Sequence, residues 1–183
     1  MPPVLWTIGH STRQIEDFVG LLQTHSIQLL IDVRAIPYSR RNPQFCKDAL
    51  AQSLAGAEVR YAGLPALGGR RQSRPGSINA GWRNSSFRGY ADYMQTAPFW
   101  TVLEALIALA GDSRTAVMCA EAVPWRCHRS LIADAMTIRG WTVQHILTAT
   151  KAGPHSLTSF AEVHNGLLSY PNPPKTDPSP GLF

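Results

Sequence analysis

Short apolar, β-favouring segments alternate with segments of helical periodicity over most of this 183-residue chain. Strands that alternate with helices in this way pair in parallel, because each helix carries the chain back to the same end of the sheet. The pattern predicts a Rossmann-like α/β fold, in which a mostly parallel sheet has helices on both faces. The predicted strands are residues 4–8, 28–33, 58–61, 115–119 and 141–147, and the main predicted helices are 12–24, 43–56, 98–110 and 127–139.

Local signals set the helix boundaries. Ser11 and Gln14 have the spacing of a capping box, which predicts Ser11 as the N-cap of the first helix. Asn42 and Pro43 are typical of the N-cap and first turn of the second helix, and Gly56 is expected to end it.

The chain is expected to form one domain and a tail. Residues 1–165 are assigned to a single α/β domain, since a domain has about 150 residues. Residues 166–183 are rich in proline and are predicted to form an extended C-terminal tail. Residues 63–89 are rich in Gly, Ser and Asn and are predicted to be a long loop that serves as a lid or binding segment, with a short helix at 89–95.

The composition excludes several classes of protein. Hydrophobic residues make up 44% of the chain, which is enough for a core, and no apolar run reaches the ~18 residues needed to cross a bilayer. The N-terminus lacks the pattern of a signal peptide, so we expect a cytoplasmic protein without membrane contact. Three cysteines (Cys46, Cys119 and Cys127) are too few for a disulfide framework, and we expect their role to be chemical.

The positive charge is concentrated in one part of the chain. The net charge is +5, but residues 34–88 contain ten basic and two acidic residues, a net charge of +8. Most of the basic residues are arginines, whose planar guanidinium suits two-point contact with phosphate or carboxylate. The expected partner is an anionic small molecule or a nucleic acid, with an ordinary solvated loop as the alternative.

Chemically reactive residues follow three of the predicted strands. Ligands of parallel α/β sheets bind beyond the carboxyl ends of the strands, where the connecting loops converge, so we expect these residues to surround one pocket. They are His10 and Ser11 after the first strand, Asp32 and Arg34 at the end of the second, and Cys119, Glu121, Arg126, Cys127, His128 and Arg129 after the fourth.

The residue types indicate roles in this pocket. Free amides and the dipole at the start of a helix attract an anion and lower the pKa of a thiol placed there. Cys119 or Cys127 is therefore the candidate nucleophile, and Glu121 or His10 the candidate proton-transfer group. The candidate substrate-binding residues are Ser11, Asp32, Arg34, Tyr90, Arg126, His128 and Arg129.

Several of these residues also have a purely structural interpretation. Cys119 alone fits a small buried hydrophobe, Asp32 with Arg34 fits a structural ion pair, and His10 fits a neutral ring that bridges loops. The remaining histidines, His145 and His155 among them, have no motif around them and are expected to be structural or exposed.

A zinc site is a further alternative. Its ligands are Cys119, Cys127 and His128, with His10 as the fourth. The seven residues between the two thiols do not match a zinc-knuckle spacing, and we assign neither a metal nor a cofactor.

Several of these motifs occur together in a recognisable order. They are residues 7–11 (TIGHS), 31–34 (IDVR) with Pro37, 42–45 (NPQF), Tyr61 with 64–65 (LP), 67–69 (LGG), 89–94 (GYADYM), 119–121 (CAE) and 127–129 (CHR). As a set they resemble the domain-of-unknown-function 488 family (DUF488). The resemblance implies a Rossmann-like α/β domain with a site built from these segments, and it implies no established reaction.

The cysteine loop also resembles, more weakly, rhodanese-type sulfurtransferases and cysteine phosphatases. Those proteins pair an Ile-Asp-Val-Arg strand end, here 31–34, with a later strand, a cysteine, a loop and a helix. In the phosphatase pattern five residues separate the cysteine from an arginine, whereas here position 125 is Trp and Arg126 comes one place late.

Three functions follow from these observations. The first is an enzyme that acts on an anionic, phosphate-bearing substrate such as a nucleotide or a nucleic-acid end. The second is a rhodanese-like sulfurtransferase or redox protein that uses the two thiols. The third is a non-enzymatic nucleic-acid-binding module, for which the basic residues 34–88 are sufficient.

Overall fold

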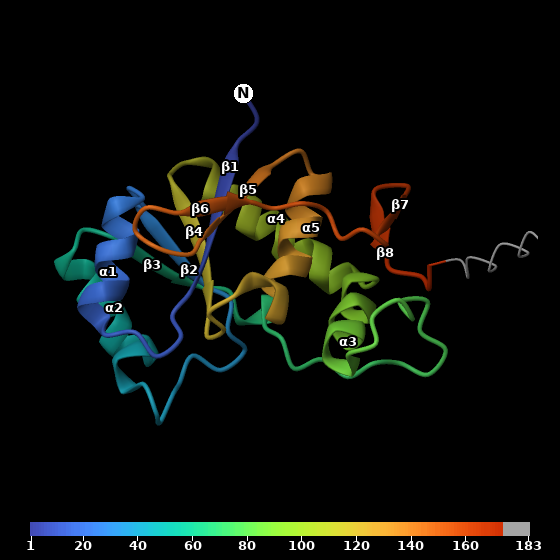
Figure 1. Ribbon diagram of the computed structural model, residues 1–183, viewed down its shortest axis with the longest axis horizontal. Helices are drawn as coiled ribbons and strands as arrows, with labels where there is room; N and C mark the ends of the chain where they lie inside the picture. The colour runs from blue at the N-terminus through green and yellow to red at the C-terminus, as the bar shows by residue number, and fades with distance from the viewer. Residues whose placement is uncertain (174–183) are drawn as a thin grey trace, which may run out of the picture.

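The computed structural model describes residues 1–173 of the chain, and within them six strands form one twisted sheet (Figure 1). The strand order is β3-β2-β4-β1-β5-β6, and every neighbouring pair is parallel except β5 and β6. The predicted α/β class with a mostly parallel sheet is confirmed. The strands are β1 (Val4–Gly9), β2 (Leu29–Asp32), β3 (Arg60–Gly63), β4 (Thr115–Cys119), β5 (Thr142–Ile146) and β6 (Ala152–Pro154).

Helices cover both faces of this sheet, because successive strand residues point to opposite faces and both sets are apolar. Ile8 of β1 packs with α1 (Ile15–Thr24) and α2 (Lys47–Gly56). Leu5 of the same strand packs in the opposite core with α4 (Ala97–Gly111) and α5 (Arg129–Ile138). The helix α3 (Ser85–Met94) extends this second core beyond the sheet (Figure 1).

The first helix starts later than predicted. Ser11 is not its N-cap: α1 begins at Ile15, and Gln14 occupies the N-cap position without a side-chain hydrogen bond. Ser11 instead has a left-handed φ of 51°, so the chain turns sharply after β1. The turn leaves Ser11 beside the carboxyl end of the sheet rather than inside a helix.

Other boundaries differ for similar local reasons. The predicted second helix is divided into a 3₁₀ turn, η1 (Pro43–Phe45), and α2, because Cys46 between them is extended. Glu58 has a left-handed φ of 58°, which delays β3 to Arg60. A second turn, η2 (Pro65–Leu67), follows β3.

Two further corrections bear on the predicted site. The side chain of Asn84 caps α3 from inside the predicted loop. A third turn, η3 (Pro124–Arg126), precedes α5, so that Cys127 lies before the helix rather than inside it.

The packed region extends beyond residue 165. A small hairpin of β7 (Glu162–His164) and β8 (Leu167–Ser169) lies at the far end of α3 (Figure 1). Leu168 and Tyr170 are buried in the core, so these residues pack on the domain although they were assigned to the tail. Residues 174–183 of the predicted tail lie outside the described residues. In residues 1–173 we find no helix with both the length and the apolar character of a membrane span.

The end of β1 passes very close to the loop after β4. A Cβ atom added to Gly9 meets the carbonyl oxygen of Glu121 at 1.7 Å and Nη2 of Arg129 at 2.9 Å. Only a glycine lets these two backbone segments approach so closely, beside the backbone hydrogen bonds from His10 to Cys119 and from Ser11 to Ala120 that join them.

We therefore expect Gly9→Ala to lower the free energy of unfolding by at least ~2 kcal/mol, as overpacking does in a rigid interior. The control is Gly20→Ala in α1, where an added Cβ meets nothing within 4 Å and helix propensity gains about 0.5–1 kcal/mol. Urea unfolding monitored by circular dichroism measures both. Equal midpoints for Gly9→Ala and wild type contradict the close approach.

Candidate active site

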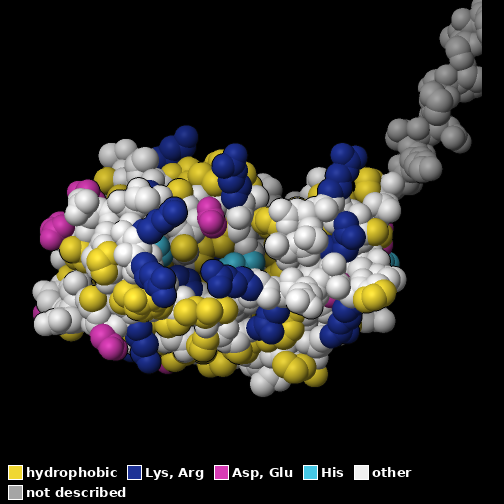
Figure 2. All heavy atoms as spheres, turned by 90° about the horizontal axis from the view of Figure 1, so that it is seen from below, with side chains coloured by type: hydrophobic (Ala, Val, Ile, Leu, Met, Phe, Trp, Pro, Cys, Tyr) yellow, Lys and Arg dark blue, Asp and Glu magenta, His cyan; other side chains and the backbone are white. Residues whose placement is uncertain are grey.

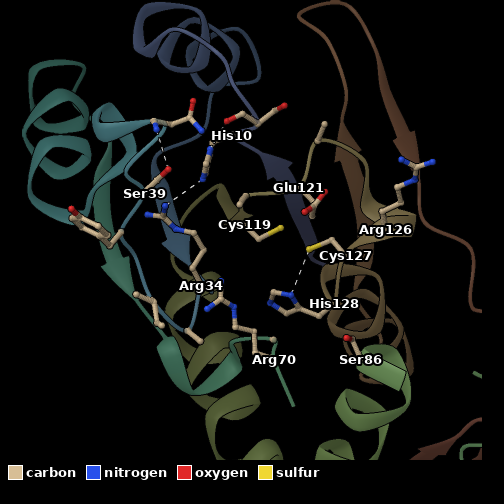
Figure 3. A pocket seen from close by; sticks show the side chains of 18 of the residues that line it. His10, Arg34, Ser39, Arg70, Ser86, Cys119, Glu121, Arg126, Cys127 and His128 are labelled. Atoms are coloured by element: carbon tan, nitrogen blue, oxygen red, sulfur yellow. Dashed lines mark hydrogen bonds between the residues drawn. The ribbon is translucent and has the colours of Figure 1, made fainter. Parts of the chain in front are cut away.

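A pocket of about 640 Å³ opens at the carboxyl ends of β1, β2 and β4 (Figure 3). The position agrees with the general rule for parallel α/β sheets. In the space-filling view of Figure 2, lysine and arginine side chains gather around a hollow in which histidine is visible. Nine of the eleven predicted site residues line the pocket: His10, Ser11, Arg34, Tyr90, Cys119, Glu121, Arg126, Cys127 and His128.

The other two predicted residues, Asp32 and Arg129, are buried behind the pocket wall. Asp32 contacts Arg34, and Arg129 contacts Cys119, so each acts on the pocket through a residue that lines it. Neither side chain lines the pocket, so the assignment of both as substrate-binding residues stays a prediction of an indirect role.

Arg34 is held in a fixed position by Asp32. Its Nε and Nη2 donate hydrogen bonds to the carboxylate at 2.9 and 2.6 Å, and Nη2 also donates to the carbonyl oxygen of Phe45 at 2.7 Å. Nη1 donates to Nε2 of His10 at 3.3 Å. A guanidinium has five N–H groups, so one on Nη1 is left for a ligand.

His10 is a neutral ring with both nitrogens occupied. Nδ1 lies 2.8 Å from the carbonyl oxygen of Ser11 and donates to it, and Nε2 accepts from Arg34. The ring stacks on Phe45 with a centroid distance of 4.2 Å. Burial, opposed by the bond to Ser11, lowers the pKa of His10 to about 4. His10 therefore orients Arg34 and is poorly suited to donate protons at neutral pH.

Arg129 places a buried positive charge directly behind the thiols. The side chain is 1% exposed, and Nε donates to Sγ of Cys119 at 3.0 Å. Nη2 donates to the carbonyl oxygen of Glu121 at 2.6 Å, and Nη1 lies 3.4 Å from Oγ1 of Thr7. No carboxylate in residues 1–173 pairs with it. An unpaired buried charge costs several kcal/mol, so this environment favours an anion on sulfur.

The two thiols differ in protonation. Burial raises the pKa of Cys119, and the neighbouring Cys127 raises it further. Burial also opposes ionisation of Cys127, but the neighbouring Cys119 thiol, the contact with His128 at 3.6 Å and the charges of His128 and Arg129 outweigh it and lower its pKa well below the usual value. Ionisation of the pair is therefore favoured at Cys127 over Cys119.

His128 is oriented toward this thiolate. Its Nε2 lies 3.2 Å from the carbonyl oxygen of Val33 and donates to it, which directs Nδ1 to Sγ of Cys127 at 3.6 Å. The backbone N–H of Arg129 reaches the same sulfur at 3.5 Å. A nucleophile, a base and a third group that orients the base are thus in contact, the general arrangement of nucleophilic catalysis.

The rim of the pocket carries exposed polar groups. Glu121 and Arg126 extend from the loop after β4, and Arg70 extends from the loop after η2 (Figure 3). Arg70 has a left-handed φ of 62°, an unusual conformation for a residue with a side chain. Arg70 was not assigned to the site from the sequence, where only the basic composition of its loop indicated a role.

Tyr90 contributes its ring but not its hydroxyl to the pocket. It is almost fully buried, and its hydroxyl donates to the carbonyl oxygen of Leu67 at 2.8 Å. Tyr90 is therefore a wall residue that fixes the loop after β3.

The side chain of Arg71 is used inside the protein and is not free for a ligand. It stacks on Tyr93 at 3.7 Å and donates to the carbonyl oxygens of Gly68 and Ala66.

The zinc alternative is not supported. Nowhere in residues 1–173 do three or more His, Cys, Asp or Glu side chains form a group that could hold a metal ion. His10 does not supply the fourth ligand, because its two ring nitrogens are used by Ser11 and Arg34.

The fold and the pocket define an α/β protein with a paired-cysteine site at the carboxyl end of its parallel sheet. The family model described as Domain of unknown function DUF488 matches residues 14–136, and the chain belongs to this family. Comparisons with curated proteins and with solved structures give no match. The membership confirms the resemblance of the sequence motifs, and it carries no reaction with it.

The lowered pKa of Cys127 predicts selective alkylation. In a Cys46→Ser background, we expect iodoacetamide to modify Cys127 before Cys119 at pH 7, since the thiolate is the reactive form. The rate should reach half its maximum well below the pH of ~8.5 that is typical of a free thiol. Mass spectrometry of the digested protein measures both rates. Preferential labelling of Cys119 contradicts the assignment.

Proposed function

We propose that the protein is a cysteine-dependent enzyme that acts on an anionic, phosphate-bearing substrate, such as a nucleotide or a nucleic-acid end. The observation that carries this proposal is the pair of buried cysteines, in contact with His128 and Arg129, in a pocket with free arginines on its rim. A thiolate with a histidine partner supports covalent catalysis, and the arginines support recognition of an anion.

The rim arginines are the groups available to phosphate. Arg70 and Arg126 are exposed, and within residues 1–173 neither forms an ion pair with a carboxylate. The remaining N–H of Arg34 supplies a third donor deeper in the pocket. Donors at two depths suit an anionic group that enters the pocket from the rim.

Cys127 is the proposed nucleophile. Its sulfur forms a bond to the electrophilic atom of the substrate, and the leaving group departs with the electron pair of the bond that breaks. A water molecule then displaces the sulfur and restores the thiolate. Glu121 on the rim is the side chain we assign to proton exchange with the leaving group and the water, since His10 has no free nitrogen.

Protection of Cys127 from alkylation tests the proposal without a known turnover assay. Inorganic phosphate, a nucleoside monophosphate and a single-stranded oligonucleotide are each added to the Cys46→Ser protein before iodoacetamide. We expect at least one probe to slow the labelling of Cys127 in a saturable way. Arg126→Gln or Arg70→Gln should weaken its affinity about tenfold, because a hydrogen bond to a charged group contributes ~1.5 kcal/mol.

The matched control is Arg139→Gln, an exposed arginine that pairs with Glu104 and does not line the pocket. Its protection should equal that of the parent protein. Protection by the oligonucleotide alone indicates a nucleic-acid end, and protection by the monophosphate indicates a nucleotide. If no probe protects Cys127, or if Arg139→Gln weakens protection as much as Arg126→Gln, the phosphate proposal is wrong.

The presence of two thiols in one pocket, each within hydrogen-bond reach of Arg129, favours a second candidate, sulfur transfer. In this reaction the Cys127 thiolate takes the outer sulfur of thiosulfate, the sulfur–sulfur bond breaks, and sulfite leaves with its electron pair. The resulting persulfide gives its outer sulfur to an acceptor such as cyanide. Cys119, as a neutral thiol donor, stabilises the negative charge on the Cys127 sulfur.

A thiosulfate–cyanide assay separates this candidate from the first. We expect any thiocyanate production to disappear in Cys127→Ser and to fall only partly in Cys119→Ser, because Cys127 carries the persulfide. Absence of thiocyanate with the wild-type protein rejects sulfur transfer from thiosulfate and leaves the phosphate proposal unaffected.

A further inference from the structure

A chain of buried and partly buried hydrogen bonds leads from Arg129 to Asp134. At its far end, His155 Nε2 lies 2.8 Å from Oδ1 of Asp134, and His155 Nδ1 lies 3.0 Å from Nε2 of His145. Asp134 is completely buried and also accepts hydrogen bonds from Thr158 and Tyr170. The two histidines, expected from the sequence to be structural or exposed, are thus part of an organised network.

The near end of this chain reaches the site. His145 Nδ1 lies 2.7 Å from Oγ1 of Thr7, and this oxygen lies 3.4 Å from Nη1 of Arg129. Arg129 in turn donates to Cys119. The chain therefore connects Asp134 in α5 with the thiol pair, through side chains from β1, β5 and the segment after β6.

The Asp134 carboxylate fixes the direction of the first hydrogen bond, and a neutral His155 ring then sets the directions of the next two. A carboxylate only accepts, so His155 donates from Nε2, and its Nδ1, when the ring is neutral, accepts from Nε2 of His145. Nδ1 of His145 then accepts from the hydroxyl of Thr7, whose oxygen is free to accept from Arg129. Burial is the largest cause that lowers the pKa of His145 to about 4, which keeps this ring neutral at pH 7.

We propose that Thr7 and His145 are positioning residues that hold the guanidinium of Arg129 against the thiol pair and thereby favour the thiolate. The inference rests on the proposed role of Cys127 as the reactive thiol. Besides the sulfur of Cys119, Thr7 is the one side chain in residues 1–173 that accepts a hydrogen bond from the guanidinium of Arg129. The other acceptor is a carbonyl oxygen of the loop after β4, at Glu121.

The other ionisable groups near Arg129 cannot replace its hydrogen bond to Thr7. Arg13, from the turn before α1, and His10 both lie close enough for the charge of Arg129 to lower their pKa. Both repel the guanidinium when charged, and neither offers it an acceptor. Loss of the Thr7 oxygen therefore leaves Nη1 of Arg129 unpartnered in the core, and we expect the guanidinium to move from the sulfurs.

Thr7→Val tests the inference, since valine has nearly the shape of threonine and no hydroxyl. In the Cys46→Ser background, we expect the pH midpoint of Cys127 alkylation to move upward and the rate at pH 7 to fall by about threefold or more, the equivalent of ~0.7 kcal/mol. Thr7→Ser keeps the acceptor and should restore the parent pH profile. His145→Gln should move the midpoint in the same direction as Thr7→Val.

Tyr170→Phe is the matched control for a purely structural effect. It removes one of the donors to Asp134 at the far end and leaves the contacts of Thr7 and Arg129 in place, so we expect lower stability with an unchanged alkylation profile. If the folded Thr7→Val and His145→Gln proteins both keep the parent midpoint, the inference is wrong. If the parent protein itself shows no lowered midpoint, the proposed function fails before the inference is reached.

Discussion

A buried guanidinium without a carboxylate partner is the constraint on which the centre of this molecule depends. Arg129 is 1% exposed, and in residues 1–173 no acidic side chain reaches it. Burial of such a charge is tolerated only where hydrogen bonds and a counter charge compensate for lost hydration. Its acceptors are two oxygens and the sulfur of Cys119, so the thiol pair is the neighbouring group of the protein that can carry a compensating charge. The contact between the Arg129 guanidinium and the thiol pair therefore affects both the reactivity of the thiols and the stability of the core.

The strand order explains why residues distant in the sequence contribute to one site. β1 lies between β4 and β5, and β2 lies on the other side of β4, so the ends of β1, β4 and β2 are adjacent. The close approach at Gly9 then brings the loop after β4 over the end of β1. Because Arg129 belongs to the helix that follows this loop, the same approach fixes its side chain under the sulfurs.

The fold could be predicted well from the sequence. A parallel sheet with helices on both faces buries its strands completely and buries one face of each helix, and both kinds of burial leave a clear hydrophobic pattern in the sequence. The strand-end rule also selected the residues that the structure places in the pocket, such as Cys127 and His128. Periodicity does not report how polar side chains pair inside the core. For this reason the occupied nitrogens of His10 and the network of His145 and His155 could not be predicted, since their partners come from other segments.

The arginines of this protein divide into two groups with different physical roles. Arg34 and Arg129 are buried, and their N–H groups are mostly used by internal acceptors, so they fix the shape and the charge of the pocket. Arg70 and Arg126 are exposed on the rim, where a long side chain without an acidic partner remains free to reorganise around a ligand. Because the interior polar groups are already fixed, no free energy is spent on reorganising them when a ligand binds. Fixed groups of this kind are suited to stabilise charge during a reaction. In the proposed function, recognition of the anion therefore belongs mainly to the rim, and the reaction belongs to the thiol pair below it.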